Sequence, residues 1–148
     1  MAKLTKYDII PEIKVTIEYY AGPIEVKDII ANRILLSKDK DFNPSYGLIA
    51  DFRNAEANIS KEDIICFINF LKSYPKLHGE RRAAILTNTP PQVVASYFYV
   101  SQLGDLPMHV SFFSTLEAAM EWIVVSTEHK SLIEEKINGH KKLHDQED

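Results

Sequence analysis

The chain of 148 residues has little cysteine, little glycine and no long hydrophobic run. Its single cysteine, Cys66, excludes an internal disulfide, and we expect this thiol to pack as a small hydrophobic group within an apolar helical segment. No segment approaches the roughly 20 apolar residues that span a bilayer, and the N-terminus lacks the apolar part of a signal peptide. These absences predict a soluble, cytoplasmic protein.

Short catalytic and cofactor motifs are also missing. The five glycines form neither a Gly-x-Gly-x-x-Gly sequence nor a Walker loop, and the Gly-x-Ser-x-Gly nucleophile elbow does not occur. The five histidines do not have the spacing of metal ligands. We therefore expect no cofactor and no metal, and we treat a non-enzymatic protein as the first hypothesis.

Positive charge is not in excess. Lys and Arg number 17 against 21 Asp and Glu, which gives a net charge of −4 at pH 7. Such a balance offers no electrostatic reason to bind nucleic acid or an anionic membrane. The apolar share of 45% is ordinary for a globular protein. We predict one domain over residues 1–138 and a disordered polar tail over residues 139–148.

Two short apolar segments predict the middle of a sheet. Residues 46–52 are too few for a helix, end near Asp51, and lead into a polar loop with a helix-capping residue, Ser60. Residues 83–87 form a second apolar segment of the length of a buried parallel strand. We expect these two strands to lie side by side.

Strand and helix patterns alternate around these segments. Residues 13–19 alternate as a half-buried strand, with Lys14, Thr16 and Glu18 on the expected solvent face. A further strand is predicted at 107–113, and helices are predicted at 24–36, 61–74, 90–102 and 116–137. This order predicts an α/β fold with a mostly parallel sheet of four to five strands, antiparallel at its N-terminal edge and flanked by about four helices.

Four stretches of the sequence resemble the SpoIIAA-like family, small bacterial domains related to the STAS domains of anti-sigma factor antagonists. They are Ala-Gly-Pro-Ile at 21–24, Leu-Ile-Ala-Asp-Phe-Arg at 48–53, Arg-Ala-Ala-Ile-Leu at 82–86, and the segment 110–123. The resemblance covers residues 8–123. It implies a SpoIIAA-like fold and a regulatory module that acts through protein–protein interaction.

The resemblance also implies a role for a serine. In STAS domains that switch sigma factors, the phosphorylated serine opens the helix after the central strand within an Asp-Ser-Ser-Gly sequence. Here the corresponding stretch is Asn58-Ile-Ser60-Lys61, which lacks the preceding aspartate and the following glycine. Ser60 lies at or beside the phosphoacceptor position, so a regulated serine and a plain helix cap both stay open.

Polar residues gather where the two predicted central strands end. Because the carboxyl ends of parallel strands meet at one edge of a sheet, we expect a binding or regulatory surface there. Two residues apart on one strand, Asp51 and Arg53 point the same way and could clamp a polar ligand, or the aspartate could tie down the next loop. The candidate binding or regulatory residues are Asp51, Arg53, Asn54, Ser60, Asn88 and Thr89.

Consecutive aromatic residues in the predicted helix at 90–102 point to a further surface. Tyr97 and Tyr99 cannot both face inward beside Phe98, so at least one tyrosine is expected on the surface. A contiguous apolar patch around it would indicate a binding face or a dimer contact.

Three functions are compatible with these observations. The first is a non-enzymatic binding or regulatory module with an unidentified protein partner, with a homodimer left open. The alternative is a carrier that holds an apolar or anionic small molecule between the sheet and the helices, in a cavity of roughly several hundred Å³. The third is an enzyme whose site has no recognised motif.

Overall fold

The computed structural model describes residues 2–56 and 58–147, which form five strands and five α-helices. The strands and the first three helices follow one another in the predicted order, and two helices follow the last strand where one was predicted. The strands are β1 Leu4–Ile10, β2 Val15–Gly22, β3 Gly47–Ala55, β4 Arg82–Leu86 and β5 His109–Phe113. The helices are α1 Val26–Ser37, α2 Lys61–Lys72, α3 Pro90–Ser101, α4 Leu116–Trp122 and α5 Lys130–Glu147.

The five strands form one mixed sheet in sequence order. β1 is the antiparallel edge strand beside β2, and β2 to β5 are parallel. β3 and β4 pair Leu48 with Ala83 and Asp51 with Leu86. The two short apolar segments therefore lie side by side as predicted, and the α/β class is confirmed.

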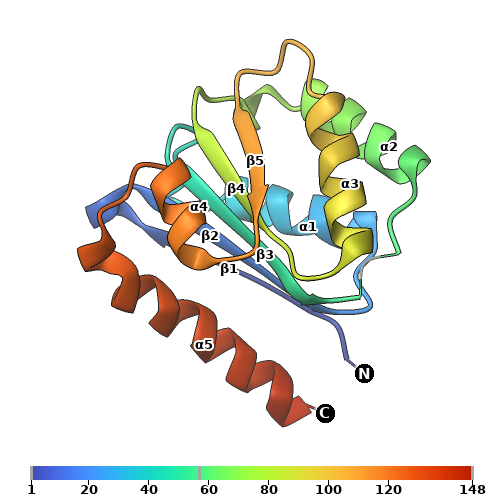
Figure 1. The fold of residues 1–148 in the computed structure, drawn as a ribbon. Helices are drawn as coiled ribbons and strands as arrows, with labels where there is room; N and C mark the ends of the chain where they lie inside the picture. Colours follow the sequence, from blue (N-terminus) through green and yellow to red (C-terminus); the bar gives the residue numbers. More distant parts are fainter. Residues whose placement is uncertain (1, 57, 148) are drawn as a thin grey trace.

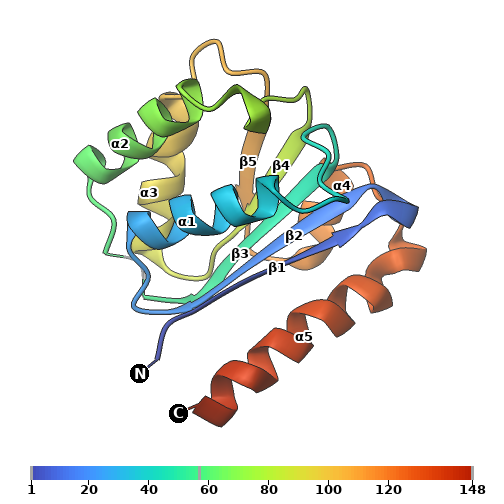
Figure 2. The ribbon, with the colours of Figure 1, turned by 180° about the vertical axis from the view of Figure 1, so that it is seen from behind.

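Helices cover both faces of the sheet (Figure 1; Figure 2 shows the reverse side). α1, α2 and α3 lie on one face, because each connects a strand to its parallel neighbour with the same hand. On that face, Phe67 and Leu71 of α2 pack with Tyr20 of β2. α4 and α5 lie on the opposite face, where Met120 and Ile133 pack with the sheet.

β2 is buried on both faces, so its prediction as a half-buried strand is wrong. All 8 of its residues are buried, and the side chains of Thr16 and Glu18 lie inside the protein. The strand lies between β1 and β3 with helices on both sides. Its alternation therefore separates two buried faces rather than a core from water.

α2 shows how the helices use their hydrophobic faces. It buries Ile64, Phe67 and Leu71 and leaves Cys66 exposed. The expected packing of this thiol is therefore wrong, because residue 66 falls outside the buried stripe. None of the helices in the described ranges is long and apolar enough to cross a membrane.

The helix predicted at 116–137 is two helices. α4 ends at Trp122, and its C-cap is Ile123. Val124 then adopts the left-handed conformation with a φ of 61°, which ends a helix in the way a C-terminal glycine does. α5 begins only at Lys130.

The predicted disordered tail is also wrong for residues 139–147. α5 continues through Gly139 to Glu147, whereas Asp148 lies outside the described residues. Contacts with the sheet explain the difference: Ile137 is buried, and Nε2 of His140 lies 2.6 Å from Oδ2 of Asp8 on β1. Local composition could not reveal these long-range contacts.

Candidate functional site

Four of the six candidate site residues lie around one polar cleft. Asp51, Arg53 and Asn54 at the end of β3 and Asn88 after β4 line this cleft, whose volume is about 410 Å³. The start of α4 and one side of α5 form its other walls. The carboxyl ends of the strands thus meet at one edge of the sheet, where the sequence predicts a working surface.

Asp51 and Arg53 form the best-defined pair in the cleft. The Asp51 side chain is 1% exposed. Nε and Nη2 of Arg53 donate to its two carboxylate oxygens at 3.0 Å each, and the backbone N–H of Arg53 donates to Oδ1 at 3.0 Å. The hydrogen bond to Asp51 is the main reason that the pKa of Arg53 is raised. Asp51 therefore ties down the end of β3, and a role of the pair in clamping a ligand stays a prediction.

Charges of both signs line the cleft in equal number. Lys130 and Lys141 of α5 join Arg53, while Glu117 and Glu134 join Asp51. Lys130 forms an ion pair with Glu117, and their hydrogen bond lowers the pKa of Glu117. Within residues 2–56 and 58–147, no three His, Cys, Asp or Glu side chains lie close enough together to hold a metal ion.

Ser60 and Thr89 cap helices and do not line the cleft. The Ser60 hydroxyl accepts a hydrogen bond from the Asp63 backbone N–H at 3.1 Å, and the Asp63 carboxylate accepts one from the Ser60 N–H at 3.0 Å. This reciprocal pair confirms the predicted cap of α2. Thr89 caps α3. A binding or regulatory role for either residue stays a prediction.

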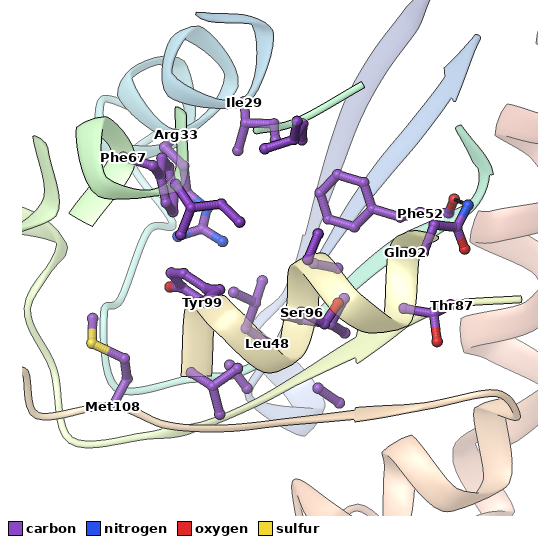
Figure 3. A pocket seen from close by; sticks show the side chains of 18 of the residues that line it. Ile29, Arg33, Leu48, Phe52, Phe67, Thr87, Gln92, Ser96, Tyr99 and Met108 are labelled. Atoms are coloured by element: carbon purple, nitrogen blue, oxygen red, sulfur yellow. Dashed lines mark hydrogen bonds between the residues drawn. The ribbon is translucent and has the colours of Figure 1, made fainter. Parts of the chain in front are cut away.

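A second cavity lies between the sheet and α1, α2 and α3 (Figure 3), the place where the alternative function, a small-molecule carrier, predicts one. Its volume is about 100 Å³, which is smaller than the roughly several hundred Å³ predicted for a carrier. Small side chains leave this space: Ala50 and Ala83 on the sheet, and Ala95 and Ser96 on α3. Because protein interiors are otherwise close-packed, such a space needs an explanation.

Two arginines line this cavity, and a glutamate lies beside them. Glu18 is fully buried and forms an ion pair with Arg33, and the Tyr20 hydroxyl donates to Glu18 Oε1 at 2.6 Å. Burial alone would lower the pKa of Arg33, but Glu18 raises it. Arg81 is 5% exposed, and its Nε and Nη1 have no hydrogen-bond partner among the described residues.

The sequence holds only a partial signal of this charge cluster. Arg33 falls on the apolar stripe of the predicted helix at 24–36, and an arginine there indicates a buried ion pair, since buried charges need partners. Its partner could not be named, because the alternation in β2 places Glu18 on a solvent face. Nothing local to Arg81 indicates burial, because its position depends on how β4 packs against its neighbours.

Comparison with known proteins identifies the fold. No protein-family model and no curated protein matches the chain. Among solved structures, it is similar to an uncharacterized protein of the DUF3478 family with a SpoIIAA-like fold from Shewanella loihica PV-4. The TM-score is 0.55 at 14% identity, and the match covers 82% of this chain and 94% of the other. The chain therefore has a SpoIIAA-like fold, which confirms the fold that the sequence resemblance implies.

Proposed function

We propose that the chain is a non-enzymatic regulatory module that binds a protein partner at the carboxyl edge of its sheet. The SpoIIAA-like fold supports this proposal, because the sequence resemblance associates that fold with regulatory STAS-type modules. One observation carries it: exposed hydrophobic side chains follow directly after Asn88 and Thr89 on α3.

These hydrophobic side chains form a stripe. Val93, Val94 and Tyr97 are 39%, 64% and 69% exposed, and they are three of the seven large exposed hydrophobic residues in the described part of the chain. Positions three and four apart share a helix face. Single exposed hydrophobic residues are normal, but a cluster marks an interaction surface. Tyr97 also confirms that one tyrosine beside Phe98 faces outward.

The polar cleft provides complementary contacts. Its three basic and three acidic side chains balance, which suits a partner segment with mixed charge better than a polyanion. Interfaces commonly combine an apolar centre with a polar rim. The stripe on α3 would then form the apolar part, and the cleft around Asp51 and Arg53 the polar part.

Site-specific photo-cross-linking in cells of the source organism tests this proposal. A benzophenone amino acid is placed at Tyr97, at Asn88, and at Glu12 as the control. Glu12 is exposed in the turn between β1 and β2, at the amino end of β2 and away from the proposed surface. We expect one and the same protein to be cross-linked from positions 97 and 88 but not from position 12.

The variant Val94→Asp provides a second arm. Because Val94 is exposed, its replacement should leave stability within about 0.5 kcal/mol of wild type, while the cross-link from position 97 should disappear. Equal labelling from all three positions would overturn the proposal, as would cross-links only between two copies of this chain. The latter result would indicate a homodimer instead.

A further inference from the structure

The cavity beneath α1, α2 and α3 has a charged end and an apolar body. Figure 3 shows Arg33, Tyr99 and Met108 toward one end of the cavity and Phe52, Thr87 and Gln92 toward the other. The side chains between them, among them Leu48, are mainly apolar. A molecule that fits this shape must combine a polar group with a hydrocarbon part.

The amide side chain of Gln92, at one end of the cavity, already has its hydrogen-bond partners. Nε2 of Gln92 donates to the carbonyl oxygens of Phe52 at 2.9 Å and Ala55 at 3.0 Å, and its Oε1 accepts from the Asn88 N–H at 2.7 Å. This side chain fastens the start of α3 to the end of β3. It therefore has little hydrogen-bonding capacity left for a ligand.

The charged end is not satisfied. Glu18 supplies one negative charge, whereas Arg33 and Arg81 supply two positive charges. Arg81 is only 5% exposed. Nε and Nη1 of its guanidinium have no hydrogen-bond partner within residues 2–56 and 58–147. A buried charge without a partner is costly. The cluster thus has room and unused donors for one more negative charge.

Arg81 keeps its positive charge at neutral pH in spite of its burial. Burial, and then repulsion by Arg33, lowers the pKa of Arg81 to about 10. The guanidinium is therefore still positively charged at neutral pH.

We infer that this cavity binds a small monocarboxylate with a short apolar body, whose carboxylate accepts hydrogen bonds from Arg81. Arginine is the side chain best suited to a carboxylate, because it presents several N–H donors in one plane. The space of about 100 Å³ is of the order of the 150 Å³ cavity that admits benzene in an apolar core. The hydrocarbon part is therefore a short aliphatic chain or a single small ring.

Other ligand classes fit less well. A cation would be repelled by the uncompensated arginine, and a neutral apolar molecule would leave its N–H groups unsatisfied. A strongly hydrated inorganic anion would lose its water shell in this cavity, and the mainly apolar walls would not replace most of the lost hydrogen bonds. The cavity shares no lining residue with the polar cleft, so the inference does not depend on the proposed protein partner.

Binding of three probes of equal chain length tests the inference: hexanoate, hexan-1-ol and hexylammonium. We expect saturable binding of hexanoate by calorimetry, with amide NMR shifts at Ala83, Ala95 and Met108, which line the cavity. Hexan-1-ol should bind at least about tenfold more weakly, since it cannot form the charge-assisted hydrogen bonds. Hexylammonium should not bind.

Arg81→Met and its matched control, Arg82→Met, locate the carboxylate. Arg82 is adjacent in sequence but exposed, and its guanidinium stacks 4.8 Å from the centroid of the Trp122 ring, outside the cavity. R81M should bind hexanoate at least about tenfold more weakly than wild type without losing affinity for hexan-1-ol. R82M should bind hexanoate as wild type does.

Ala95→Leu tests the apolar part independently of Arg81. The larger side chain should fill the cavity and weaken both hexanoate and hexan-1-ol, and dispersed NMR spectra should show that the variant is folded. The inference is wrong if wild type shows no saturable binding of hexanoate in the millimolar range. It is equally wrong if R81M binds hexanoate as tightly as R82M does, or if the shifts occur away from the cavity.

Discussion

Arg53 holds the buried carboxylate of Asp51 through two side-chain hydrogen bonds of 3.0 Å each. We expect Arg53→Ala to lower the free energy of unfolding by about 1.5–3 kcal/mol, because it removes charge-assisted bonds from a carboxylate that stays buried. Arg53→Lys should fall between wild type and Arg53→Ala, since a lysine keeps the charge but not the planar two-point contact. Urea denaturation of the three proteins measures both effects.

The same experiment separates two roles of the pair. A loss of stability shows that Asp51 and Arg53 tie down the end of β3. If Arg53→Ala instead stays within about 0.5 kcal/mol of wild type, the contact contributes little to folding, and the guanidinium is free to serve a ligand in the cleft.

Two buried arginines, Arg33 and Arg81, lie near Glu18. Among the described residues, Glu18 is the only acidic residue that forms an ion pair with either of them. Glu18→Gln should therefore cost about 3–5 kcal/mol, because it leaves Arg33 without its counter-charge next to Arg81. In the Arg81→Met background the same substitution should cost less, since one positive charge has been removed. A double-mutant cycle by urea denaturation gives this coupling.

Thr16 provides a control on the same buried face of β2. Its Oγ1 is buried without a hydrogen-bond partner among the described residues. Thr16→Val should therefore be close to neutral or stabilising. A large loss in Thr16→Val as well would mean that any change on this face disrupts packing, and the electrostatic explanation for Glu18 would fail.

Local patterns predict much of this fold. The two segments now in β3 and β4 were identifiable because their short apolar runs end in turn residues, and Ser60 was identifiable because a capping box involves only neighbouring positions. The gathering of Asp51, Arg53, Asn54 and Asn88 followed from a general property of parallel sheets. These features require no knowledge of which helix packs on which strand.

Features that depend on distant packing were missed. Glu18 alternates like a solvent-facing residue, and only the helices on both faces of β2 make it buried. The size of the cavity could not be derived either, because it depends on small side chains from three separate elements: Ala50 on β3, Ala83 on β4 and Ala95 on α3. The order in α5 likewise depends on β1, through the contact of His140 with Asp8.

Asp39 should make stability depend on pH in the acid range. The backbone N–H of Asp41 and the Tyr7 hydroxyl both donate to its carboxylate at 2.9 Å, and these bonds lower its pKa below the ordinary value of 3.8. A lowered folded pKa stabilises the protein above the unfolded value, and this contribution is lost as the pH falls through the folded pKa.

Asp39→Asn should therefore be less stable than wild type at neutral pH, and the difference should shrink from about pH 5 to about pH 3. Tyr7→Phe, which removes one of the two bonds, should show the same trend with a smaller amplitude. Urea denaturation across this pH range gives the curves. A difference between wild type and Asp39→Asn that is independent of pH would contradict the assignment.

Substitutions at Ser60 separate capping from regulation. Ser60→Ala should cost about 1 kcal/mol, because the Asp63 N–H loses its acceptor, whereas Ser60→Asp should keep the cap and the stability. If Ser60 is regulated by phosphorylation, Ser60→Asp should also weaken the cross-link from position 97 to the partner. An unchanged cross-link in a stable Ser60→Asp protein would leave Ser60 as a helix cap alone.

Val124 occupies a backbone conformation that suits glycine. Its φ of 61° is left-handed, which costs a residue with a Cβ atom roughly 1–2 kcal/mol. The side chain is 76% exposed, so little packing is lost when it is removed. The closing bonds, from Val124 N–H to Glu121 O at 3.1 Å and from Val125 N–H to Met120 O at 3.0 Å, involve only the backbone.

Val124→Gly should therefore stabilise the protein by about 0.5–1 kcal/mol. The substitution removes the backbone strain, but glycine has more conformational freedom in the unfolded chain, which offsets part of this gain. Val125→Gly is the matched control and should destabilise, because Val125 is partly buried and packs against the core beneath α4. Thermal unfolding of both variants measures the effects. If Val124→Gly destabilises as much as Val125→Gly, the left-handed residue is not a source of strain, and another contact must set the break between α4 and α5.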